Sequence, residues 1–142
     1  MSISARNQLQ GSISQVTTGA VNDEVVLTLK DGGDLVAVVT HSSRESLGLA
    51  QGKAAIAVIK APWVTLASED CGYRFSARNQ FPGSVAALHT GAVNSTVTVK
   101  TDAGITLTAV ITNDAASEMT LQTGTRVLAL VKASSVLLAV KA

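Results

Sequence analysis

The sequence predicts a mainly β protein made of two tandem five-stranded barrels, each with one short helix. The first observation is a repeat: the residues SARNQ at 4–8 return unchanged at 76–80, and matching residues continue at an offset of 72 without a gap. The second is that each copy contains short runs of β-branched and aliphatic residues separated by turn signals. The repeat therefore predicts two domains, at residues 2–69 and 74–142.

The first copy begins with three predicted strands. Residues 9–16 alternate loosely between apolar and polar types and include Gly11, which is typical of a strand with a bend or bulge. Residues 17–23 are predicted as a turn, because their glycine and asparagine tolerate positive φ. Residues 24–30 and 35–40 are two β runs joined by Asp-Gly-Gly-Asp, which is a hairpin signal. These segments predict a three-stranded meander.

The remaining elements complete the order of an OB-like barrel. Residues 42–45 form a capping-box motif and Gly52 offers a stop, so a short helix is expected between them. Strands are expected over 54–60 and 63–67, with a break at residues 61–62 because of the proline. Three strands, a short helix and two strands is the OB-like order. The second copy repeats it, with strands at 81–88, 96–100, 105–112, 126–132 and 135–140 and a short helix after Asn113-Asp114.

Composition restricts the classes of function. Charged residues are 15% of the chain, against about 25% in an average soluble domain, so apolar surface is expected to be buried in a homo-oligomer. A net charge of +1 and an aromatic share of 3% argue against a nucleic-acid partner, which needs a basic field or stacking platforms. Neither a leader nor an apolar run long enough for a membrane span is recognisable. The sequence predicts a cytoplasmic protein with no membrane partner.

Two cations and several hydroxyls recur at matching positions of the two copies. A small tetrahedral oxyanion needs N–H and O–H donors, one or two cations and no repelling carboxylate, so this set predicts an anion site. The alternative is that the cations are solvated charges at strand ends and the hydroxyls belong to turns. The recurring residues are Ser4, Arg6, Thr40 and Lys60 in the first copy and Ser76, Arg78, Thr112 and Lys132 in the second.

The turns TGAVN at 18–22 and 90–94 are a second candidate anion site. Successive backbone N–H groups in such a turn can form an anion-binding nest. Plain hairpin turns are the alternative interpretation.

The residues offer little for catalysis. His41 and His89 have no histidine counterparts in the other copy, and the single Cys71 excludes an intramolecular disulfide. No nucleophile pair and no metal-ligand spacing recurs. The protein is therefore predicted not to be an enzyme.

Three motifs together resemble the Mop domain of the molbindins, a TOBE-type module: SARNQ at the start of each copy, TGAVN in its first turn and KAPWV at 60–64. The resemblance covers essentially the whole chain. It implies a protein of two Mop domains that binds and stores molybdate, and tungstate also, in metal homeostasis, with no direct protein–metal ligand. It further implies a homo-trimer that holds the oxyanion between subunits.

The resemblance also assigns residues to two kinds of site. The implied oxyanion residues are Ser4, Ala5, Arg6, Thr40, Ser43, Lys60 and Ala61 in the first copy, and Ser76, Ala77, Arg78, Thr112, Lys132 and Ala133 in the second. A second oxyanion site is implied at the turns formed by Gly19, Ala20, Val21 and Asn22 and by Gly91, Ala92, Val93 and Asn94.

The two copies are not identical at the implied site. Ala115 stands where the first copy has Ser43, and Ser134-Ser135 replace Pro62-Trp63. Trp63 itself is interpreted as packing in the core or in an interface. Because one hydrogen bond to a charged group is worth about 1.5–3 kcal/mol, the two kinds of half-site are expected to differ in affinity. Two other functions stay open: an OB-fold module that binds oligonucleotides, and a scaffold that delivers molybdate to cofactor biosynthesis.

Overall fold

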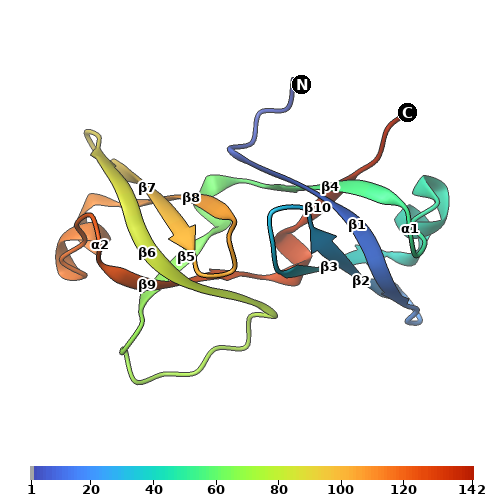
Figure 1. The fold of residues 1–142 in the computed structure, drawn as a ribbon, viewed down its shortest axis with the longest axis horizontal. Helices are drawn as coiled ribbons and strands as arrows, with labels where there is room; N and C mark the ends of the chain where they lie inside the picture. Colours follow the sequence, from blue (N-terminus) through green and yellow to red (C-terminus); the bar gives the residue numbers. More distant parts are fainter. Residues whose placement is uncertain (1) are drawn as a thin grey trace.

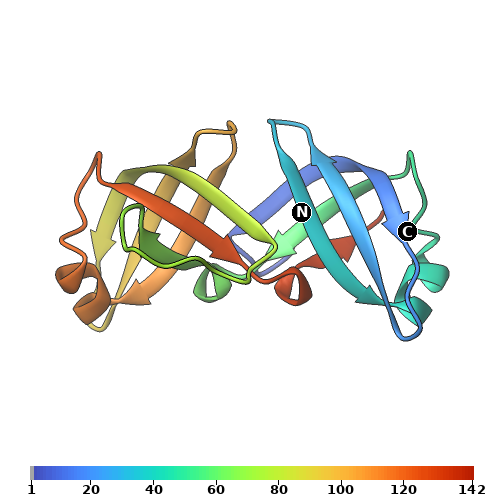
Figure 2. The same ribbon diagram turned by 90° about the horizontal axis from the view of Figure 1, so that it is seen from below.

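Residues 2–142 are described by a computed structural model, in which two curled five-stranded sheets lie side by side (Figures 1 and 2). The first repeat contains strands β1 (Asn7–Thr17), β2 (Asn22–Leu29), β3 (Asp34–Thr40), β4 (Ala54–Ile59) and β5 (Thr65–Ser68), helix α1 (His41–Leu47) and the 3-10 turn η1 (Ala61–Trp63). The second contains β6 (Asn79–Thr90), β7 (Asn94–Thr101), β8 (Thr106–Thr112), β9 (Arg126–Val131) and β10 (Leu137–Ala139), helix α2 (Asn113–Glu118) and the 3-10 turn η2 (Ala133–Ser135). The predicted fold, two mainly β barrels with one short helix each, is confirmed.

The two repeats exchange their last strands. β5 pairs with β9 of the second repeat, for example at Leu66 and Ala129, and β10 pairs with β4 of the first, at Leu138 and Ala57. The sheets therefore have the orders β10-β4-β1-β2-β3 and β5-β9-β6-β7-β8. The repeats are units of sequence, but each barrel takes its fifth strand from the other repeat. This exchange ties the two barrels together, while α1 and α2 lie at the outer ends of the molecule (Figure 2).

The strands bury one face against a shared core. In β2, every second residue from Asp23 to Leu29 is buried, and β7 shows the same pattern 72 positions later. This period of two is expected of strands that are buried on one side. The buried apolar side chains of both sheets form one contiguous cluster, which includes Leu35 and Leu107.

The ends of the first helix differ from those predicted. Thr40, not a residue of the Ser42 capping box, is the N-cap of α1: its backbone is extended and its Oγ1 accepts a hydrogen bond from the Ser43 N–H at 3.1 Å. Gly48, at φ 63°, ends the helix before the predicted Gly52. The helix begins directly at the end of β3, so its cap is the last strand residue, which the capping-box motif did not indicate.

Gly11 and Gly19 are required because another part of the backbone lies close to them. The predicted bulge at Gly11 and the predicted positive φ at Gly19 are wrong. The bulge in β1 lies after Ile13 and not at Gly11. A Cβ at Gly11 would lie 2.4 Å from the carbonyl oxygen of Thr28 on the neighbouring strand. In the first turn neither Gly19 nor Asn22 has a positive φ, but a Cβ at Gly19 would lie 2.2 Å from the Asn22 carbonyl oxygen. Backbone contact therefore explains both positions.

The last strands of the repeats begin later than predicted. The break at residues 61–62 is confirmed, and the 3-10 turn that contains Pro62 extends through Trp63, so β5 begins at Thr65. The corresponding turn in the second repeat moves the start of β10 to Leu137. Trp63 is 47% exposed and does not belong to the core.

Candidate functional site

Five of the predicted oxyanion residues of the second repeat gather at one end of its sheet. They belong to the segments just before β6 and just after β9. These strands are antiparallel neighbours with Asn79 opposite Val131, so the start of one lies beside the end of the other. All five line one pocket of about 620 Å³: Ser76, Ala77, Arg78, Lys132 and Ala133.

The other walls of this pocket come partly from the first repeat. Trp63 and Thr65, which follow β4, and Val38 on β3 all line it. Ser134 and Ser135 add two further hydroxyls, and no acidic residue is among the described residues that line the pocket. The pocket therefore lies at the junction of the two repeats and offers two cationic side chains with several hydroxyl donors.

The first repeat brings its corresponding residues together in the same way. Asn7 of β1 lies opposite Ile59 of β4, so the segment before β1 lies beside the segment after β4. The side chains of this cluster are exposed, except that Ala5 is half-buried and Ala61 is buried. The residues concerned are Ser4, Ala5, Arg6, Lys60 and Ala61.

Asn7 and Asn79 are buried and were not predicted as site residues. Each holds the arginine segment beside it against the other repeat. Asn79 accepts a hydrogen bond from the Val36 N–H at 2.7 Å and donates to the Val36 carbonyl at 2.8 Å. Asn7 makes the same pair of contacts with Thr108, at 2.7 and 2.8 Å. These matching contacts relate the repeats by an approximate twofold symmetry. They fix where Arg6 and Arg78 enter the junction.

One carboxylate of the first repeat reaches the pocket arginine. Arg78 donates from Nη1 to Oε2 of Glu24 at 2.7 Å and from Nη2 to Oε1 at 2.9 Å. The hydrogen bond from Arg78 holds the pKa of the Glu24 carboxyl below its usual range. Sequence reasoning missed this contact because Glu24 belongs to the other repeat. At the position that corresponds to Glu24, the second repeat has Thr96.

The predicted threonines lie at the opposite end of each barrel from these clusters. Thr40 ends β3 and pairs with Asn22 at the start of β2, beyond the far end of β1. Thr112 pairs with Asn94 in the same way. Within one chain, the structure therefore separates Thr40 and Thr112 from the arginine and lysine of their own repeats.

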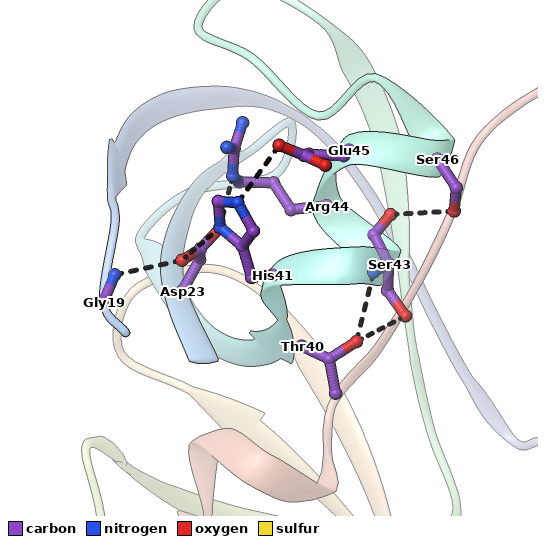
Figure 3. A network of polar contacts seen from close by, with 8 residues as sticks. All are labelled: Gly19, Asp23, Thr40, His41, Ser43, Arg44, Glu45 and Ser46. Carbon is purple, nitrogen blue, oxygen red and sulfur yellow. Dashed lines mark hydrogen bonds and ion pairs between the residues drawn. The ribbon is translucent and has the colours of Figure 1, made fainter. Parts of the chain in front are cut away.

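The hydroxyls at the helix starts are arranged differently in the two repeats. Thr40 Oγ1 donates to Ser43 Oγ at 2.8 Å and accepts from the Ser43 N–H (Figure 3). Thr112 Oγ1 accepts from the Ala115 N–H at 3.1 Å, but alanine has no hydroxyl to receive the threonine proton. Among the described residues, neither the Ser43 hydroxyl of the first repeat nor the Thr112 hydroxyl of the second donates a hydrogen bond.

The two TGAVN turns lie beside these threonines. The Val21 carbonyl accepts the His41 N–H at 2.9 Å, and the Val93 carbonyl accepts the Asn113 N–H at 2.9 Å. The glycine N–H of each turn already has a partner in the chain: Gly19 donates to the Asp23 side chain and Gly91 donates to the Asn94 carbonyl. The side chains of Val21 and Val93 are more than 70% exposed at the turn tips.

A charged network, also missed from the sequence, fastens the first turn to α1 (Figure 3). The Asp23 side chain is fully buried and accepts hydrogen bonds from the Gly19 N–H at 3.0 Å and from Arg44 Nε. His41 Nδ1 lies 3.0 Å from Asp23 Oδ2, and His41 Nε2 lies 3.0 Å from Glu45 Oε1. Burial raises the pKa of Asp23, but these hydrogen bonds together outweigh it and hold the pKa below its usual value. The spacing of His41 and Glu45 was the one sequence signal for this network.

In the second barrel, neutral groups connect the first turn to α2. Ser95 replaces Asp23 and donates to Asn113 Oδ1 at 2.6 Å, while Asn113 Nδ2 donates to the Gly91 carbonyl at 2.9 Å. Ala116 and Ser117 stand where the first repeat has Arg44 and Glu45. The two outer ends therefore have the same backbone and different charge.

Among residues 2–142, no group of three or more His, Cys, Asp or Glu side chains is placed to hold a metal ion. None of the described helices is a candidate for a membrane span.

The fold and the donor clusters define a class of protein: two OB-like barrels in tandem that present cationic and hydroxyl side chains at their junction. The chain belongs to the TOBE domain family, whose model matches residues 3–66 and 76–138. The two matches coincide with the two repeats. The family predicted from the three sequence motifs is therefore confirmed.

Similar proteins extend this comparison. The chain is 47% identical to the chain in a crystal structure of the cytoplasmic molybdate-binding protein ModG with molybdate bound; the match covers 99% of this chain and 100% of that one, with a TM-score of 0.93. The molybdenum-pterin-binding protein MopA of Rhodobacter capsulatus is 43% identical over 139 residues, which is 98% of this chain and 52% of MopA. The molybdenum transport protein ModE of Herbaspirillum seropedicae is 40% identical over 141 residues, 99% of this chain and 52% of ModE. The chain thus spans about half the length of these two relatives.

Proposed function

We propose that the protein binds and stores molybdate, and tungstate also, as part of metal homeostasis in the cytoplasm, without catalysing a reaction. The observation that carries the proposal is the pocket lined by Arg78, Lys132 and neighbouring hydroxyls, whose described lining contains no acidic residue. Two positive charges and several O–H donors suit a dianion. The similarity of the whole chain to molybdate-bound ModG supports the choice of oxyanion.

The complete site lies, in this proposal, between the chains of a homo-trimer. Thr40 and Ser43 lie at the other end of the barrel from Arg6, so the donors that the resemblance assigns to one repeat do not meet within that repeat. A second chain that presents its α1 end to the junction of the first would supply the missing hydroxyls. The exposed Val21 and Val93 and the low charged share support assembly, because association would remove this apolar surface from water.

Selectivity follows from a site built of donors. On the Arg6 side, where Thr96 stands at the position of Glu24, a bound P–OH group of hydrogen phosphate would find no carboxylate to accept its proton, and an unpaired buried donor costs about 1–3 kcal/mol. Sulfate carries the same charge as molybdate but is smaller, so the same donors cannot all reach it. The site is therefore expected to prefer molybdate and tungstate to both competitors.

Native mass spectrometry and titration calorimetry with molybdate test this function. Arg6→Ala and Arg78→Ala should each weaken binding at their own sites by roughly 10- to 100-fold, since each removes hydrogen bonds from a charged donor. Arg126→Ala is the matched control, because Arg126 is also an exposed arginine in ion pairs but lies at the start of β9, away from the pocket. The proposal predicts a trimer that gains several molybdates. A folded wild-type protein that binds none would refute it.

Nucleic acid is not a partner in this proposal. The net charge of +1 gives no basic field that could hold a phosphate backbone. Retention of single-stranded oligonucleotides that falls steeply with salt would contradict this. Delivery of the oxyanion to biosynthetic enzymes would appear instead as specific capture of those enzymes by the molybdate-loaded trimer.

A further inference from the structure

The two arginines that correspond in the repeats have different surroundings. Arg78 is held by both oxygens of Glu24, a residue of β2 in the other barrel, through a bidentate pair at 2.7 and 2.9 Å. Arg78 also lines the pocket at the junction of the repeats. The Nη1–Nη2 edge of this cation is thus occupied by a carboxylate of the same chain.

Arg6 has no such carboxylate at the matching position. The contacts of Asn7 with Thr108 reproduce those of Asn79 with Val36, so the segment before β1 meets the second barrel as the segment before β6 meets the first. The residue that corresponds to Glu24 on that side is Thr96 of β7. A threonine carries no charge that could neutralise a guanidinium.

We propose that Glu24 is an intramolecular competitor for Arg78, and that it makes the oxyanion sites of the second repeat weaker than those built on Arg6. The inference rests on the proposed oxyanion function. A carboxylate and a tetrahedral dianion both seek the paired N–H groups of a guanidinium. A dianion that binds at Arg78 must displace Glu24 or accept a negative charge beside it.

The exposure of the pair allows this competition. The Arg78 side chain is 53% exposed and the Glu24 side chain 32% exposed. Ion pairs in contact with solvent contribute little to stability, so a ligand can separate this one. Glu24 therefore tunes affinity and does not block the site. At low oxyanion concentration the Arg6 sites fill first, and the Arg78 sites fill at higher concentration.

Exchanging the two residues tests the proposal. Glu24→Thr copies the second barrel, and Glu24→Gln removes only the charge, while Thr96→Glu transfers the carboxylate to the Arg6 side. Molybdate binding to the assembled full-length protein is measured by calorimetry, with thermal melting to verify folding. Both Glu24 variants should tighten the weaker class of sites by about 2- to 10-fold, and Thr96→Glu should weaken the stronger class by a similar factor.

The outcomes are distinct. If the Glu24 variants leave the weaker class unchanged or weaken it, the competition is refuted and Glu24 either positions Arg78 for the ligand or takes no part. If the wild-type protein shows one class of identical sites, the inference also fails, while the oxyanion function stands. If no variant and no wild-type protein binds molybdate, the proposed function fails and the inference with it.

Discussion

The two barrels share a backbone and a core but differ in charge. β1 and β6 each carry a bulge at the same place, after Ile13 and after Val85. The polar ends differ: buried Asp23 has Ser95 as its counterpart, and the two sites use different partners. In both barrels the buried side-chain polar atoms of the described residues have hydrogen-bond partners. Core packing thus keeps the backbones of the two barrels alike. At the outer ends, different polar residues can serve as long as each buried polar group has a hydrogen-bond partner.

The largest losses of stability are expected from core substitutions, and they should be equal in the two barrels. Leu35→Ala and Leu107→Ala remove corresponding side chains that are both fully buried, and each should lower the free energy of unfolding by about 2–5 kcal/mol. Because the barrels exchange strands, both variants should shift one common transition in chemical denaturation. Two separate transitions, with each variant moving a different one, would contradict the coupling of the barrels.

Replacing the asparagines at the junction should cause the next largest loss of stability. Asn7→Ala and Asn79→Ala each leave a backbone N–H and C=O of the other repeat without a partner. An unsatisfied buried group costs about 1–3 kcal/mol, so each variant should lose stability in that range. Gln80→Ala is the control, because its exposed side chain bonds only to nearby backbone carbonyls. Asparagine variants as stable as this control would show that the junction does not depend on these contacts.

The charged network should make the outer end of the first barrel sensitive to acid, whereas the corresponding end of the second barrel is held by neutral groups. The pKa of Asp23 is lower in the folded protein than its ordinary value, so its contribution to stability is complete above about pH 4 and is lost as the pH falls through the folded pKa. A variant that copies the second barrel should lose less stability than the wild type on acidification; its changes are Asp23→Ser, His41→Asn, Arg44→Ala and Glu45→Ser.

Urea denaturation between pH 6 and pH 2 measures this difference. Glu24 and Asp102, whose pKa values are also lowered by arginine partners, are present in both proteins, so their contributions cancel. Parallel curves for the two proteins would mean that Asp23 is not responsible for acid sensitivity.

The smallest effect is expected at the exposed arginine of the second barrel. Arg126 pairs with Glu69 and Asp102, where the first barrel has Ala54 at the corresponding position. Exposed ion pairs contribute little, so Arg126→Ala should shift the denaturation midpoint less than either asparagine variant does. A larger shift would mean that this surface network fastens the connection after β5 to the barrel.

The sequence by itself determined the strand runs, the hairpin and the family. Alternating β runs, the Asp-Gly-Gly-Asp hairpin and the break at residues 61–62 depend on neighbouring residues, and the structure contains all three. The sequence grouped the arginine of SARNQ with the lysine that follows β4 or β9, and antiparallel pairing does bring the start of one strand to the end of its neighbour. That these clusters lie at the junction of the repeats was not predicted.

Only the tertiary structure decided which repeat supplies the fifth strand of each sheet and the carboxylate that binds Arg78. A strand pattern specifies which side chains face the core, but in a duplicated chain Leu66 and Leu138 fit either sheet equally well, so the exchange of β5 and β10 has no local signal. The same ambiguity hid the pairing of Glu24 with Arg78. It also hid the distance of Thr40 from Arg6, since contacts between residues far apart in sequence follow from how the two barrels pack and not from the residues beside them.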